Sequence, residues 1–134
     1  MNLACLNSGS KKSGEQYARL AERYRFVPLE EADVVVVLGG DGMLLQVIHE
    51  TLSLGKPIYG MNSGTVGFLL NEFNPDDLEQ RIAEAITVPI APLLMRVETR
   101  DGEARELLAF NEVALWRQSG QSANLSITIA GRVA

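Results

Sequence analysis

The feature that most constrains this chain is an apolar run at residues 34–38 that leads directly into the sequence GGDG at residues 39–42. Five consecutive apolar residues, most of them valine, are typical of a strand buried on both faces, as in a parallel sheet covered by helices. An apolar pattern with helical spacing begins immediately after the glycines. The sequence therefore predicts a strand, a tight turn and a helix, with the turn at one edge of a sheet.

This glycine turn has the properties of a phosphate site. Gly39, Gly40 and Gly42 permit a tight backbone path and leave amide groups uncovered near a helix N-terminus, where anions bind. Asp41 is the exception, because a carboxylate repels phosphate unless it binds a cation or takes a proton from an attacking hydroxyl group. We therefore expect Asp41 to act as general base in a phosphoryl transfer, with the glycine amides donating to phosphate oxygens. The alternatives are that Asp41 only caps the helix and that the glycines only form the turn.

The segments around this turn continue an α/β pattern. The predicted strands and helices alternate, at residues 3–6, 13–23, 33–38, 42–54 and 57–61. Strand, helix and strand within about thirty residues form a βαβ unit, which implies parallel strands and a right-handed crossover. Gly55 is a natural residue to end the second helix. Asn74 and Pro75 predict the cap and first residue of a further helix.

A second glycine-rich loop, at residues 62–68, follows the 57–61 strand and is expected at the same sheet edge as the GGDG turn. The pattern then changes. Strands are predicted at 93–99 and 107–117, around a hairpin turn, and strict alternation predicts another at 125–129. Such strands are antiparallel and half exposed. The predicted domains are an α/β nucleotide-binding domain at 1–90 and the beginning of an all-β domain at 91–134. We expect its remaining strands to belong to a longer parent chain.

Composition excludes some classes of protein. The chain has 134 residues, of which 46% are hydrophobic and 22% charged, as in an ordinary soluble globular protein. Its net charge of −5 argues against nucleic acids and anionic membranes as partners. Without a signal peptide or a long apolar run, it is expected in the cytoplasm. The single Cys5 is expected to be a buried thiol, and no cluster of ligand residues suggests a structural metal.

Three stretches, at residues 38–45, 60–69 and 110–113, resemble the NAD kinase family in sequence, order and approximate spacing. The family transfers a phosphoryl group from ATP, or in some cases inorganic polyphosphate, to the 2′-hydroxyl of the adenosine ribose of NAD, giving NADP. The resemblance implies a βαβ Rossmann-like nucleotide-binding domain followed by the first antiparallel strands of a β-sandwich domain. It covers nearly the whole chain, but only about the first half of a typical member.

The resemblance also implies roles for individual residues. It gives Asp41 the part of general base and places Asp41 and Gly42 against NAD. It places Phe68 at the adenine, with Asn62 nearby, and makes Asn111 and Glu112 hydrogen-bond NAD. These last two are expected in mid-strand, where a polar pair indicates a functional face or, alternatively, a solvent-facing one. The expected ATP and phosphate site comprises Gly39, Gly40, Gly42, Asn62 and Gly64.

The family likeness further implies Mg²⁺, or another divalent cation, arriving with ATP, and a homodimer or homotetramer. Two other functions stay open. Lipid kinases of the diacylglycerol kinase type have a similar GGDG loop, and a short chain suits a non-catalytic nucleotide-binding fragment. His49 is expected on a helix surface, and Trp116 in a core or a subunit interface. The sequence does not decide between ATP and polyphosphate, or between NAD and NADH.

Overall fold

The computed structural model describes residues 1–64 and 67–133, and the chain divides into two compact units, Met1–Pro92 and Leu93–Ala134. The first unit contains helices and a parallel three-stranded sheet, and the second contains antiparallel strands. This α/β content, with parallel strands followed by antiparallel ones, is confirmed. The finer assignments, a Rossmann-like domain and a β-sandwich, remain predictions. Residues 65 and 66 of the second glycine loop lie outside the described residues.

The sheet of the first unit is built around its middle strand. Strands β1 (Leu3–Asn7), β2 (Val34–Gly39) and β3 (Ile58–Asn62) are parallel and lie in the order β1-β2-β3. Every residue of β2 is buried, because this strand has a neighbour on both edges and helices over both faces. The uninterrupted apolar run therefore became the central strand, as the sequence predicts.

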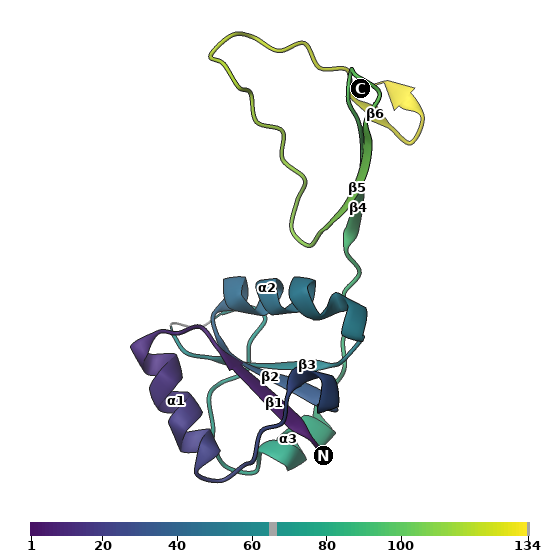
Figure 1. Cartoon of the computed structure of the whole chain (residues 1–134). Coiled ribbons are helices and arrows are strands. Elements are labelled where there is room, and N and C mark those ends of the chain that lie inside the picture. The colour runs from purple at the N-terminus through teal and green to yellow at the C-terminus, as the bar shows by residue number, and fades with distance from the viewer. Residues whose placement is uncertain (65–66, 134) are drawn as a thin grey trace. The chain divides into compact units, whose positions relative to one another are not determined.

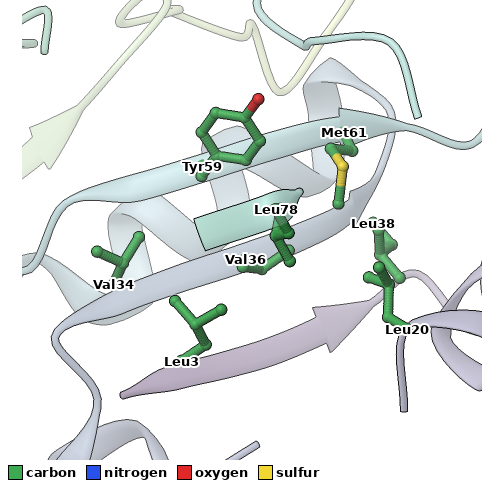
Figure 2. Close-up of a cluster of buried hydrophobic side chains, with 8 residues drawn as sticks. All are labelled: Leu3, Leu20, Val34, Val36, Leu38, Tyr59, Met61 and Leu78. Atoms are coloured by element: carbon green, nitrogen blue, oxygen red, sulfur yellow. The ribbon is translucent and has the colours of Figure 1, made fainter. Parts of the chain in front are cut away.

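Helices cover the two faces of this sheet. Helix α2 (Asp41–Thr51) lies on one face, and α1 (Lys11–Ala21) and α3 (Leu78–Glu84) lie on the other (Figure 1). Side chains alternate along β2 accordingly. One set packs with Leu20 of α1 and Leu78 of α3 (Figure 2). The other set packs with two residues of α2. The β2 residues in these two clusters are Val34, Val36 and Leu38 on the α1 face, and Val35 and Val37 on the α2 face.

The connections leave β1 and β2 in opposite directions. Leu3 pairs with Val34 of β2 and also forms a parallel bridge with Phe26, which must use the other edge of β1. The chain thus passes from β1 through α1 to one side of β1, whereas β2 leads through α2 to β3 on the opposite side. Open α/β sheets bind ligands at such a point, beyond the carboxyl ends of the strands. Here it lies between Asn7 and Gly39.

The helix boundaries differ from the predicted ones at several places. Helix α1 begins before residue 13, because the side chain of Ser10 caps it by accepting from the backbone N–H of Ser13. It also ends two residues earlier than predicted. Helix α2 ends at Thr51 and continues as a single 3₁₀ turn, Leu52–Leu54. Gly55 follows with φ 59°, in the left-handed conformation expected of a residue that ends a helix.

The predicted helix start at Asn74 is wrong. The Asn74 side chain accepts from the backbone N–H of Asp76, which forms a local turn rather than a helix cap. Asp77 then adopts φ 51°, and α3 begins only at Leu78, whose N–H donates to the Tyr24 hydroxyl at 3.0 Å. The tertiary contact with Tyr24 therefore replaces the local cap.

The second unit is a hairpin and a short strand pair. Strands β4 (Leu93–Glu98) and β5 (Ala104–Ala109) are antiparallel around a turn with Gly102 at φ 83°. The predicted return strand to residue 117 is wrong, since β5 ends where its partner does. Ala109 pairs with Leu93, and the residue before Leu93 is a proline, which has no N–H to extend the ladder.

The predicted strand at 125–129 is largely wrong. Only β6 (Thr128–Ile129) forms, paired with β7 (Arg132–Val133). An alternating sequence needs a neighbouring strand, and within 1–64 and 67–133 residues 125–127 have none. Trp116 is 90% exposed, so it lies in no core formed by the described residues, and the alternative of a subunit interface stays a prediction. No helix in the described part of the chain has the length and hydropathy needed to cross a bilayer.

Candidate functional site

The first glycine turn joins β2 to α2 at the carboxyl edge of the sheet. Gly39 must lack a side chain, because a Cβ there would come within 2.8 Å of the Met43 Cβ. Gly40 takes the N-cap position, and a Cβ at Gly40 or Gly42 would meet no atom within 4 Å among the described residues. The space beside the Cα atoms of Gly40 and Gly42 is therefore not occupied by other described residues.

The first turn of α2 is free of a side-chain cap. No side chain among the described residues hydrogen-bonds to it, and its first N–H groups lack partners within the helix itself. Such N–H groups, together with the positive end of the helix dipole, favour an anion. The arrangement fits the phosphate role expected for Gly39, Gly40 and Gly42, which stays a prediction.

Asp41 is the first residue of α2, and its carboxylate turns towards the second glycine loop. One oxygen accepts from the backbone N–H of Phe68 at 3.0 Å, and the other accepts from the backbone N–H of Leu69 at 3.2 Å. A Cβ at Gly67 would lie 2.6 Å from an Asp41 carboxylate oxygen, so this position also needs glycine. Among the described residues, these side-chain hydrogen bonds of Asp41 go to the second glycine loop and not to its own helix.

The carboxylate of Asp41 is half buried and makes no ion pair with a lysine, arginine or histidine of the described residues. Each carboxylate oxygen has two lone pairs, and one N–H bond on each leaves a lone pair to accept a proton. Asp41 is thus both oriented and chemically competent as a base. The two glycine loops, far apart in sequence, meet at this residue.

Backbone bonds hold the second loop beside the first. The N–H of Ser63 donates to the Gly39 carbonyl at 2.8 Å. Asn62 donates through its N–H to the Asn71 carbonyl, and its side-chain oxygen accepts from the Gly64 N–H at 2.7 Å. These bonds bring the expected ATP-site residues Asn62 and Gly64 to the same sheet edge as the GGDG turn.

One functional candidate was missed from the sequence. Gln16 of α1 is 6% exposed, and its amide contacts two residues of the second loop. The inward face of α1 carries Ser13, Gln16 and Leu20, at a spacing of three and four, and Tyr17 packs against the same core while partly buried. A glutamine at a core-facing position of an otherwise regular helical pattern is the signal that could have found it.

A pocket of about 730 Å³ opens between α1 and the segment that follows the second loop. It takes in Asn62 and Gly64 but not Asp41 or the GGDG glycines. Lys12 is exposed and also lines this pocket. Its lining residues are Lys12, Glu15, Gln16, Arg19, Asn62, Gly64, Leu70, Asn71, Glu72 and Phe73.

The remaining expected site residues are exposed. Phe68 has a fully exposed side chain and contacts Asp41 only through its backbone. Asn111 and Glu112 belong to the second unit, where one residue separates them from the end of β5, so the expected mid-strand position is wrong. His49 is exposed on α2, as predicted.

The described residues do not themselves form a metal centre. Within residues 1–64 and 67–133, no group of three or more His, Cys, Asp or Glu side chains could hold an ion. A divalent cation that arrives with ATP stays a prediction.

Comparisons with known proteins point to one family. Residues 5–89 match the family described as the ATP-NAD kinase N-terminal domain. The chain is 50% identical to the NAD kinase of Brucella suis biovar 1 (strain 1330) over 128 residues, which are 96% of this chain and 50% of the relative. It is 44% identical to that of Mesorhizobium japonicum over 132 residues, 98% of this chain and 51% of the relative. The chain spans about half the length of the curated relatives it matches.

Proposed function

Since this chain belongs to the NAD kinase family, we propose that the full-length protein transfers a phosphoryl group from ATP to the 2′-hydroxyl of the adenosine ribose of NAD. The observation that carries the proposal is the position of Asp41. Its carboxylate stands at the N-terminus of α2, where the N-cap residue is a glycine, and accepts from two N–H groups of Phe68 and Leu69. A fixed base beside an anion site is what phosphoryl transfer to a hydroxyl group needs.

In the proposed reaction, Asp41 accepts the proton of the ribose 2′-hydroxyl. That oxygen forms a bond to the γ-phosphorus of ATP, the bond to the β–γ bridging oxygen breaks, and ADP leaves. The amides of Gly39, Gly40 and Gly42 donate to phosphate oxygens, where negative charge must be held. Mg²⁺ bound to ATP supplies further neutralisation of phosphate charge. We place Asn62 and Gly64 on the ATP side of the site.

NAD would be held by residues of both units. The fully exposed ring of Phe68 is available to stack on the adenine, and its backbone N–H orients Asp41 at the same time. Asp41 and Gly42 would contact NAD beside the attacking hydroxyl. Asn111 and Glu112, exposed after β5, would hydrogen-bond NAD, with Glu112 at a ribose diol.

The finer parts of the proposal concern organisation. Residues 1–90 would form a Rossmann-like nucleotide-binding domain, and residues 91–134 would begin a β-sandwich domain that binds NAD. The full-length protein would be a cytoplasmic homodimer or homotetramer. Inorganic polyphosphate would be an alternative phosphoryl donor.

The test is product analysis with the full-length protein, ATP and Mg²⁺, offering NAD, NADH and diacylglycerol as separate acceptors. We expect NADP from NAD and no phosphatidic acid. Phosphorylation of diacylglycerol instead would favour the lipid kinase. Nucleotide binding by calorimetry without any product would favour a non-catalytic module, and either result would overturn the proposal.

A further inference from the structure

Gln16 is a buried amide side chain in the face of α1 that packs on the sheet. It is 6% exposed, and it neighbours Leu20, which is fully buried in the core. A buried amide is costly unless its donors and acceptors are satisfied. Among the described residues, no buried side-chain nitrogen or oxygen lacks a partner, so Gln16 is satisfied where it lies.

The partners of Gln16 belong to the second glycine loop, not to its own helix. Its side-chain N–H donates to the Asn62 carbonyl at 3.1 Å, and its side-chain oxygen accepts from the hydroxyl of Ser63. Ser63 is itself 8% exposed. One side chain from α1 therefore contacts two consecutive residues at the start of the loop, of which Ser63 is buried and Asn62 is partly exposed.

Further hydrogen bonds connect residues of this loop to the GGDG turn and to Asp41. Ser63 is also tied to the first glycine turn by its N–H bond to the Gly39 carbonyl, at 2.8 Å. At its other end, the loop supplies the N–H groups of Phe68 and Leu69 to the two oxygens of the Asp41 carboxylate. Gln16 thus contacts the start of the loop, and the N–H groups that orient the carboxylate come from Phe68 and Leu69.

We propose that Gln16 is a positioning residue for the phosphoryl transfer, holding the second glycine loop where its N–H groups aim Asp41 at the attacking hydroxyl. This inference rests on the proposed function. Gln16 would act through the loop, since its side-chain hydrogen bonds go to Asn62 and Ser63. Its loss would leave Asp41 in place on α2 but would let the two N–H groups drift, and a displacement of about 1 Å can cost about 10²-fold in rate.

The experiment uses Gln16→Met in the full-length protein, because methionine keeps the length and volume of the side chain and removes both hydrogen-bonding groups. Ser63→Ala is a milder second variant that removes only one of the two contacts. The matched control is Gln80→Met on the exposed face of α3, where Gln80 donates only to Glu84 in the following turn. Steady-state kinetics with NAD and amide hydrogen exchange are measured for each.

We expect Gln16→Met to lower kcat by about 10–100-fold with KM for NAD within twofold of wild type, as for a lost transition-state interaction. We also expect faster exchange at the Phe68 and Leu69 amides, with β2 amides unchanged. Ser63→Ala should show a smaller effect of the same kind, and Gln80→Met none.

The inference is overturned if Gln16→Met keeps both the wild-type kcat and the wild-type exchange at these two amides. It is also overturned if only the melting temperature falls, since that is the result of a purely structural role. A wild-type protein that forms no NADP would instead contradict the proposed function, and the exchange measurement would still report on the loop.

Discussion

The two units of the chain use apolar residues in opposite ways. In the first unit β2 is buried along its whole length, and its side chains fill two clusters on the two faces of the sheet. In the second unit large apolar side chains lie on the surface, with Leu115 84% exposed and Trp116 90% exposed. The first unit therefore contains its own core, whereas the apolar residues of the second have no cover within the described residues. That the rest of a longer parent chain covers them stays a prediction.

The largest expected effect on stability compares a leucine in the core of the first unit with an exposed leucine in the second unit. Leu38 is fully buried in β2, so Leu38→Ala should lower the free energy of unfolding by about 2–5 kcal/mol through lost burial and a cavity. The same change at Leu115 should alter it by less than about 0.5 kcal/mol. Urea unfolding of both variants measures the difference. Equal losses would mean that the second unit buries its leucines after all.

The next effect tests the contact between the two glycine loops. Gly67→Ala would place a Cβ 2.6 Å from an Asp41 oxygen and displace the carboxylate from the Phe68 and Leu69 amides. We expect kcat of the full-length protein to fall by about 10–100-fold. The control is Gly120→Ala in the second unit, where no described atom lies within 4 Å of the new Cβ. Unchanged kcat for Gly67→Ala would remove the loop from the catalytic arrangement.

A smaller effect compares polar contacts in the two units. The Lys56 ammonium donates to the backbone carbonyls of Leu29, Glu30 and Ala32 at 2.6–2.7 Å, which ties the chain before β2 to the start of β3. Lys56→Met should cost roughly 1–2 kcal/mol of unfolding free energy, because it removes the Lys56 donor from all three carbonyls, of which Leu29 keeps a bond from the Ala32 N–H.

The matched change in the second unit is Arg96→Met. Its ion pair with Glu106 spans 2.7 Å, but the two side chains are 74% and 61% exposed. Solvent screens such a pair, so the loss should stay below about 0.5 kcal/mol by urea unfolding. A larger loss for Arg96→Met than for Lys56→Met would reverse the comparison.

The smallest effect concerns pH. Burial raises the pKa of the Cys5 thiol from its ordinary 9.0 to about 12. The unfolded chain therefore loses this proton first, and stability that is fully present below pH 9 declines as pH rises towards 12. At pH 9.5 the wild type should be less stable by about 0.8 kcal/mol than at neutral pH through this group. Cys5→Ala should lack that part of the decline. Adding Leu115→Cys to the Cys5→Ala protein should not restore it, because residue 115 is exposed.

The first unit was largely predictable from the sequence because its elements follow from local patterns. The valine run, the glycines that end β2 and the left-handed Gly55 each specify their structure through period, turn chemistry or backbone sterics. The start of α3 was not predictable, since Tyr24, distant in sequence, supplies the hydrogen bond to Leu78. In the second unit, the length of each strand depends on the neighbouring strand with which it pairs. An alternating sequence does not identify that neighbour.

The candidate site was predictable in part for the same reason. The GGDG turn could be recognised as a candidate site from local sequence, because its glycines and its carboxylate lie between a predicted buried strand and a predicted helix. The contact of Asp41 with Phe68 and Leu69 joins residues 27 and 28 positions apart and depends on the register of β2 and β3. Gln16 was overlooked because its contacts with the second loop span 46 and 47 positions.

The central claim is that the Asp41 carboxylate takes the proton of the attacking hydroxyl. Asp41→Asn keeps the size of the side chain and removes the base, and Asp101→Asn in the β4–β5 turn is the control. Single-turnover NADP formation by the full-length protein should slow by about 10²–10⁴-fold in Asp41→Asn, with NAD affinity by calorimetry close to wild type. A wild-type rate in Asp41→Asn would contradict the claim.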